Sequence, residues 1–151
     1  MRSLAIRMVL FISCLVNAPW ALAGLVVVAS SQSPLSQLTR DQVVNIYMGG
    51  NRKLPDGSSA HAFEPELDSA VRRAFYHRLL DKSVEEINAY WARLVFSGRT
   101  QPPVFTKNVA ELLERVSKDP HAIGYLDQSQ LPRADSVAPG HDLKILFVLP
   151  D

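Results

Sequence analysis

The run Leu-Val-Val-Val-Ala at positions 25–29 most constrains how this chain can fold. An unbroken apolar run that is rich in β-branched residues is typical of a strand covered on both faces. A strand with one face in water would instead alternate apolar with polar residues. The run therefore predicts a parallel or mixed sheet that lies between helices.

Helix starts are marked in two places by capping boxes, in which each side chain bonds the backbone N–H group of the other residue. Thr39 with Gln42 and Ser83 with Glu86 have this spacing. We expect a helix to follow each box. The helix after Ser83 should bury one apolar stripe with helical periodicity. That stripe consists of Ile87, Tyr90, Trp91, Leu94 and Val95.

Two further helices are expected, one from about Asp68 to Leu80 and one that begins at Asn108 and stops before Asp119. Residues 101–103 are predicted to form a loop, and residues 128–142 a longer surface loop. Short strands are expected at 61–64, at 122–126 and, fully buried, at 144–149. The glycine within 122–126, Gly124, indicates a close backbone approach. Strands that alternate with helices predict an α/β fold, a three-layer α/β/α sandwich with a mixed sheet.

The first 23 residues have the features of a secretory signal peptide. Arg2 and Arg7 precede a short apolar run, and Ala21-Leu22-Ala23 fits a signal-peptidase site. We expect cleavage before Gly24, which leaves residues 24–151 as a single domain in the periplasm or outside the cell. The apolar run is too short to span a bilayer, so no membrane span is expected after cleavage.

The composition of residues 24–151 excludes several kinds of partner and chemistry. Without Arg2 and Arg7 there are 14 basic and 15 acidic residues, a formal charge of −1, so no basic field invites nucleic acid. The lone cysteine, Cys14, leaves with the signal peptide, which removes disulfide and thiolate chemistry. The four histidines lack the paired spacing of a zinc site, and we expect neither a metal nor a cofactor. No Gly-x-Ser-x-Gly elbow or glycine-rich phosphate loop is present, so an enzyme is not expected.

The start of the helix near Asp68 is a candidate anion site. Free N–H groups and the helix dipole favour an anion there, Ser69 can donate a hydrogen bond, and Arg72 can add a charged contact. Arg73 should point about 100° away from Arg72. The alternative is that Asp68 or Ser69 only caps the helix, while the arginines are solvated or paired with Glu64, Glu66 or Asp68.

Ser30 and Ser31 follow the first strand directly. Open α/β sheets bind ligands beyond the carboxyl ends of their strands, so these serines are further candidates for an anion site. The alternative is an ordinary polar loop.

Five segments resemble, in order, parts of the phosphate-type solute-binding proteins of ABC transporters. These are residues 38–49 with an Ile-Tyr-x-Gly end, 54–57, 68–75, 91–103 with Trp, Phe-x-Gly and Pro, and 122–125 with Ala-Ile-Gly-Tyr. The resemblance implies one lobe of a type II periplasmic binding protein, which binds without catalysis. It also implies an acid such as Asp68 near the ligand, to accept a proton of phosphate. The family's Ser-Gly-Thr turn is Ser69-Ala70-Val71 here, so the threonine hydroxyl is missing.

Two functional hypotheses follow. The first is a periplasmic solute-binding protein for phosphate or another small oxyanion. The alternative is an accessory module of the cell envelope that no longer holds solute and instead docks on a partner protein or forms a homodimer. An exposed apolar patch would favour the alternative.

Overall fold

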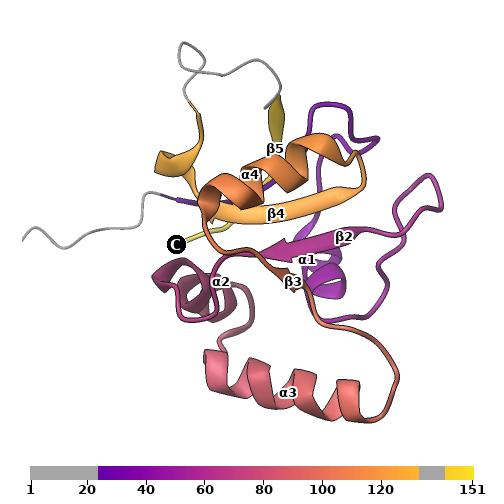
Figure 1. Cartoon of the computed structure of the whole chain (residues 1–151), viewed down its shortest axis with the longest axis vertical. Coiled ribbons are helices and arrows are strands. Elements are labelled where there is room, and N and C mark those ends of the chain that lie inside the picture. Colours follow the sequence, from indigo (N-terminus) through magenta and orange to yellow (C-terminus); the bar gives the residue numbers. More distant parts are fainter. Residues whose placement is uncertain (1–23, 133–141) are drawn as a thin grey trace, which may run out of the picture.

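The computed structural model describes residues 24–132 and 142–151 (Figure 1). The predicted signal peptide and residues 133–141 of the predicted loop lie outside this range. The elements are, in chain order, β1 (Leu25–Ser30), α1 (Arg40–Tyr47), β2 (His61–Glu64), α2 (Ala70–Leu80), α3 (Val84–Phe96), β3 (Val104–Phe105), α4 (Val109–Lys118), β4 (Ala122–Asp127), the short 3₁₀ helix η1 (Gln128–Gln130) and β5 (Leu143–Val148).

The described strands form one mixed sheet in the order β3-β2-β4-β1-β5. β2 runs parallel to both of its neighbours, β3 and β4. β1 runs antiparallel to β4 and β5. The mixed sheet confirms the prediction that was based on the apolar run in β1.

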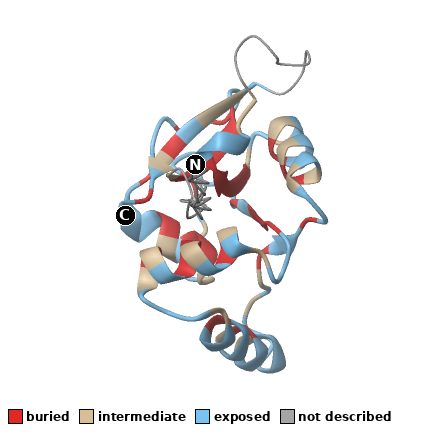
Figure 2. Ribbon diagram, turned by 90° about the vertical axis from the view of Figure 1, so that its left-hand side faces the viewer, coloured by how far each residue is buried: buried red, intermediate tan, exposed pale blue. Residues whose placement is uncertain are grey.

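Alternate residues of β1 point into two separate cores. Leu25, Val27 and Ala29 pack with α1, α2 and α3, whereas Val26 and Val28 pack with Leu112 and Val116 of α4. Figure 1 shows α4 in front of the sheet, and Figure 2 shows the buried residues gathered between the layers. The α/β/α sandwich is therefore confirmed, and it explains why β1 needs apolar residues at consecutive positions.

The local signals at helix starts also hold in the structure. Both capping boxes, Thr39 with Gln42 and Ser83 with Glu86, are formed. Gly124 allows α4 to approach β4, because a Cβ atom there would lie 3.0 Å from Cγ2 of Val116. The expectation of a close backbone approach at this glycine is confirmed.

Two predictions about local structure are wrong in part, and one short strand was not predicted. The short strand β3 follows the predicted loop directly and has only two residues, too few to leave a periodic signal. β5 is an edge strand in which only Leu146 is buried, and not the buried strand predicted. The predicted apolar stripe of α3 is buried only at Ile87 and Trp91, and Val95 is 51% exposed. α3 lies at the bottom of the molecule in Figure 2, where few other elements cover it.

Candidate functional site

Two helices start beyond the carboxyl ends of the parallel strands β2 and β3, one on each side of the sheet. β2 leads to α2, which packs on the same face as α1 and α3. β3 leads to α4, which packs on the opposite face. Chain connections that leave adjacent parallel strands toward opposite faces open a crevice between them, and open α/β sheets bind ligands in such crevices.

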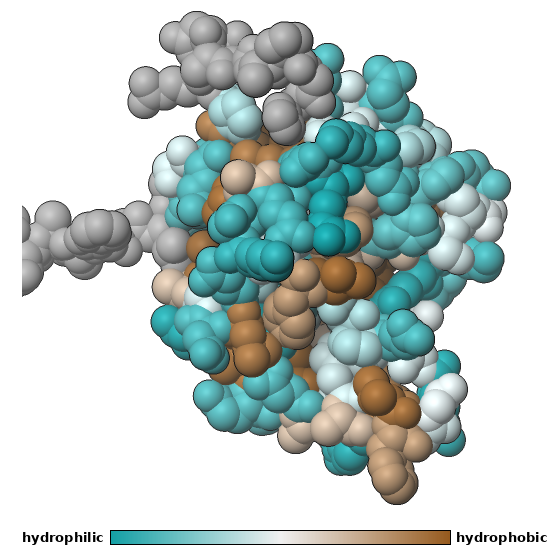
Figure 3. Space-filling view, viewed as in Figure 1, coloured by the Kyte–Doolittle hydropathy of each residue, from teal (hydrophilic) through white to brown (hydrophobic). Residues whose placement is uncertain are grey.

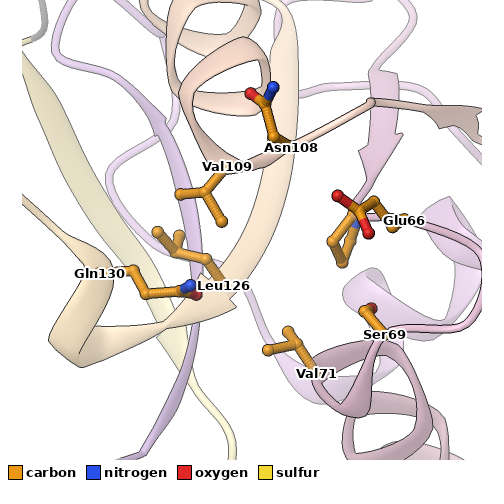
Figure 4. A pocket seen from close by; sticks show the side chains of 8 residues that line it. Glu66, Ser69, Val71, Asn108, Val109, Leu126 and Gln130 are labelled. Atoms are coloured by element: carbon orange, nitrogen blue, oxygen red, sulfur yellow. The ribbon is translucent and has the colours of Figure 1, made fainter.

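A cavity of about 190 Å³ lies between the first turns of α2 and α4. Liquid water takes up about 30 Å³ per molecule, so the cavity has room for a small solute with several heavy atoms. Figure 4 shows Asn108 and Val109 at the top of the cavity, Leu126 and Gln130 on the left, and Glu66, Ser69 and Val71 on the right and below; Pro65 completes the lining.

The two cap residues, Ser69 and Asn108, both line this cavity, and Figure 4 shows the Asn108 side-chain amide pointing away from Ser69. The Ser69 hydroxyl oxygen accepts a hydrogen bond from the Arg72 backbone N–H at 3.1 Å, and Asn108 Oδ1 accepts one from the Glu111 N–H at 2.9 Å. The Ser69 hydroxyl acts as an acceptor in this bond, so its proton can still donate to a ligand.

Backbone groups add to this donor, because the first N–H groups of a helix have no carbonyl partner one turn earlier. In α2 and α4 they include the N–H groups of Val71 and Val109, two residues that line the cavity. The positive ends of both helix dipoles also point toward this space. Among the described lining residues none is basic, and Glu66 contributes a carboxylate. The groups of this lining that could donate to an anion are therefore backbone and neutral ones.

Arg72 does not line this cavity, and the prediction that it faces an anion at the helix start is corrected by its surroundings. It is 1% exposed, and its Nε donates to Glu64 Oε2 at 2.9 Å. Its Nη2 donates to Asn88 Oδ1 at 2.9 Å. The alternative, in which Arg72 pairs with Glu64, is the arrangement that the structure has. The guanidinium is held inside the fold because Glu64 is itself buried and requires a cationic partner.

The Glu64–Arg72 pair belongs to a larger buried network. The Tyr76 hydroxyl donates to the second carboxylate oxygen of Glu64. Burial raises the pKa of Glu64, although the hydrogen bond from Tyr76 and the charge of Arg72 act in the opposite direction. Burial, together with the nearby Glu64 charge, also raises the pKa of Tyr76 far above its usual value. Removing either charged partner would leave the other buried without compensation.

Asp68 lies just before the cap and is exposed, and it is not part of the cavity lining. Its backbone carbonyl accepts a hydrogen bond from Arg73 Nη1 at 2.6 Å. The acid that does line the cavity is Glu66. The sequence analysis named Asp68 as the acid near a ligand and treated Asn108 only as a helix cap, whereas Glu66 and Asn108 are the residues that line this cavity. The signal that could have found Asn108 is its position directly before the helix that follows β3.

Ser30 and Ser31 lie at the other end of the sheet, so the structure does not bring them to Ser69. β1 is antiparallel to β4, and its carboxyl end therefore lies beside the amino end of β4. The Ser30 hydroxyl donates to the Ser117 carbonyl oxygen at 3.2 Å, near the C-terminal end of α4. The rule about carboxyl ends was applied to a strand that runs the opposite way from β2 and β3.

Neither a metal site nor a membrane helix is found in residues 24–132 and 142–151. These residues contain no group of three or more His, Cys, Asp or Glu side chains that could hold a metal ion. None of the helices within the same ranges is both long enough and apolar enough to cross a bilayer.

Comparison with models of protein families gave no match, and comparison with curated proteins gave none either. Solved structures do match. An ABC-type phosphate transport receptor from Vibrio cholerae aligns with 83% of this chain and 46% of its own length, at 18% identity and a TM-score of 0.57. The fold is that of one lobe of a periplasmic phosphate-binding protein.

Two other structures give the same picture. A substrate-binding protein assigned to a phosphate ABC transporter of Clostridium perfringens, with phosphate bound, aligns with 86% of this chain and 57% of its own, at 16% identity and a TM-score of 0.57. A proposed phosphate-binding protein from Planctomyces limnophilus aligns with 82% and 40%, at 16% identity and a TM-score of 0.58. This chain therefore spans about half of the length of the structures it matches. At these identities the likeness shows the fold.

Proposed function

We propose that this chain is a non-enzymatic binding module for phosphate or a similar small oxyanion, held in the cavity between the first turns of α2 and α4. The observation that carries the proposal is the convergence of two helix N-termini on one cavity beyond the carboxyl ends of parallel strands. Each N-terminus offers free N–H groups and a positive dipole end. The phosphate-related descriptions of the structures with the same fold support this choice of ligand.

In this proposal the ligand is held by neutral donors. These donors are the Ser69 hydroxyl and the N–H groups of Val71 and Val109, three residues that line the cavity. No arginine contact is invoked, because Arg72 is already paired with Glu64. A ligand that stays partly in contact with water is bound weakly, and salt screens its charge. We expect an affinity in the roughly micromolar to millimolar range.

Glu66 should favour a protonated oxyanion. A carboxylate beside the ligand repels a fully ionised anion but accepts a hydrogen bond from one that carries a proton. At neutral pH inorganic phosphate is a mixture of H₂PO₄⁻ and HPO₄²⁻, which both still carry a proton, whereas sulfate has none to donate. Phosphate should therefore bind more tightly than sulfate, and Glu66→Gln should reduce this preference by strengthening sulfate binding.

Isothermal calorimetry with phosphate and sulfate tests the proposal on the purified protein. Ser69→Ala should weaken phosphate binding about tenfold or more, since it removes a donor to the anion. Ser83→Ala is the matched control, because Ser83 caps α3 in the same way but does not line the cavity. The absence of heat from wild-type protein at millimolar phosphate would reject the proposal.

The proposal also covers where in the cell the protein works. We infer that residues 1–23 are removed on export and that the protein works in the periplasm, alongside a transport system for the oxyanion. The basic and apolar pattern of that segment supports export. Mass spectrometry of protein from the envelope should then find a chain that begins at or near Gly24. Recovery of a chain that still begins at Met1 would contradict this part.

A second candidate function is a protein-interaction module, and one observation favours it. Large apolar side chains are exposed at the end of α3 and on β3, of which Phe96 is 96% exposed. The calorimetric experiment separates the two candidates, because an interaction module without a solute site gives no heat with phosphate. The two activities are also compatible, since no residue lines both the cavity and this apolar surface.

A further inference from the structure

One face of the molecule exposes apolar side chains next to one another. We call it the α3–β3 face, made of the C-terminal half of α3 and of β3 with the prolines before it. Figure 3 shows apolar surface over the end of α3 at the lower right and near the centre, where β3 lies. In Figure 3 paler surface separates these two apolar areas, and exposed apolar surface of this kind is a candidate for an interaction site. Its most exposed members are Val95 at 51%, Phe96 at 96%, Val104 at 51% and Phe105 at 41%.

The same face contains a groove of about 470 Å³. Its walls are apolar, and its base is closed by the Glu64–Arg72 pair and Asn88. The walls consist of Trp91, Ala92, Val95, Phe96, Pro102 and Phe105. Phe96 is therefore at once a wall of the groove and a projecting side chain beside it. A projection and a hollow on one face can fit a second copy of the same face across a two-fold axis.

The charges on α3 favour that second copy over an unrelated partner. Glu85 lies in the first turn of the helix, and Arg99 follows its C-terminal end; both are exposed. Among the described residues neither has an ion pair. α3 has 13 residues and is about 20 Å long, so a residue in its first turn and one just beyond its C-cap are too far apart to pair within one chain.

Two α3 helices that pack antiparallel about Ala92 bring opposite charges together. Glu85 of one copy then lies opposite Arg99 of the second copy, and the same pair forms again at the other end. Ala92 is small and exposed, which permits close approach at the axis. Such rim pairs set orientation more than affinity, while the buried aromatic residues supply the binding energy.

We propose that the α3–β3 face is the interface of a two-fold homodimer, in which Phe96 of each copy enters the groove of the other and Glu85 pairs with Arg99 across the axis. The proposal does not depend on oxyanion binding. The cavity between α2 and α4 and the groove have no lining residue in common, so the dimer leaves the cavity open.

Sedimentation velocity on the purified protein tests this at about 0.1 mM, enough to populate a dimer of roughly micromolar Kd. Wild type should sediment as a dimer, and Phe96→Asp should raise the dimer Kd about 30-fold or more. Val148→Asp is the matched control, since Val148 is an apolar residue of β5 that is 56% exposed outside this face. A monomeric wild type, or a Phe96→Asp variant that stays dimeric, would overturn the proposal.

A charge exchange tests the two-fold arrangement itself. Glu85→Arg and Arg99→Glu should each weaken the dimer, because each places like charges opposite one another. The double variant should restore it, since the pairs re-form with their signs reversed. Circular dichroism should be unchanged in all three variants, because both side chains are exposed. A double variant no better than the two single variants would contradict the antiparallel arrangement.

Discussion

The cavity between α2 and α4 and the groove beside α3 differ in how they use charge, although the same helix contributes to both. Ser69 and Val71 of the α2 start line the cavity, while Arg72, one position on, closes the base of the groove. The cavity is rich in free backbone donors and contains one carboxylate. The groove has a full guanidinium charge at its base, but Glu64 neutralises it.

This difference shows that a basic side chain near a helix start need not face the space at that helix start. Successive residues of a helix point about 100° apart, so one step along α2 moves a side chain from the cavity into the interior. There the requirement to compensate a buried charge decides its role. The groups left available for a ligand are the neutral ones that the fold does not use.

The largest expected effect is at the buried pair beneath the groove. Arg72→Ala should lower the free energy of unfolding by about 3–5 kcal/mol, because it leaves Glu64 buried without its partner. Denaturant titration measures this. The double variant Glu64→Leu/Arg72→Met should lose less than Arg72→Ala alone, since no uncompensated charge remains. A loss below about 1 kcal/mol for Arg72→Ala would show that the guanidinium is not held inside as described.

A loss of similar size is expected at the wall of the groove. Trp91 is 5% exposed, and a Cβ atom on Gly49 would lie only 2.7 Å from Cη2 of its ring. Trp91→Ala should therefore leave a large void and lower the free energy of unfolding on the order of 3–5 kcal/mol. Phe96→Ala, in the same helix, is the comparison, because Phe96 is exposed. Equal unfolding midpoints for Trp91→Ala and Phe96→Ala would contradict the packing of α3 described above.

Around the cavity the effects on stability should be smaller. Ser69→Ala and Ser83→Ala each remove one cap hydrogen bond, and each should lower the free energy of unfolding by about 1 kcal/mol. Thermal unfolding of both variants checks this. Equal stability losses with unequal effects on phosphate binding would separate capping from ligand contact. A much larger loss for Ser69→Ala would mean that it supports the buried network.

The smallest effect is expected next to the buried pair. Arg73 is exposed, and its side chain bonds only the Asp68 carbonyl in the structure described. Arg73→Ala should change the free energy of unfolding by no more than about 0.5 kcal/mol and leave phosphate affinity unchanged at physiological salt. Measured beside Arg72→Ala, it isolates the effect of a single step along α2. A large loss of binding in Arg73→Ala would move the anion site out of the cavity.

Local features of this fold could be predicted from the sequence, whereas long-range pairing could not. The capping boxes at Thr39 and Ser83 involve residues three positions apart, so the chain itself shows them. The direction of β1 depends on β4, about a hundred residues away, and a buried apolar run does not show it. Ser30 was therefore placed at the wrong end of the sheet.

The candidate site was predicted in part for the same reason. Ser69 could be identified because a cap and a helix start are local features. Its partner Asn108 could not, because β3 is too short to show a pattern and pairs with β2 across about forty residues. The sequence left three acidic residues as possible partners of Arg72. Only the fold shows that Arg72 pairs with buried Glu64.

The most direct test of the oxyanion site is a phosphate titration followed by ¹⁵N–¹H NMR of the assigned protein. The account predicts that the largest amide shifts occur together in the first turns of α2 and α4, at Val71 and Val109, which line the cavity. Shifts near Ser30, at the opposite end of the sheet, should be negligible. Shifts confined to one helix start, or none at millimolar phosphate, would contradict the claim that the two N-termini together form an oxyanion site.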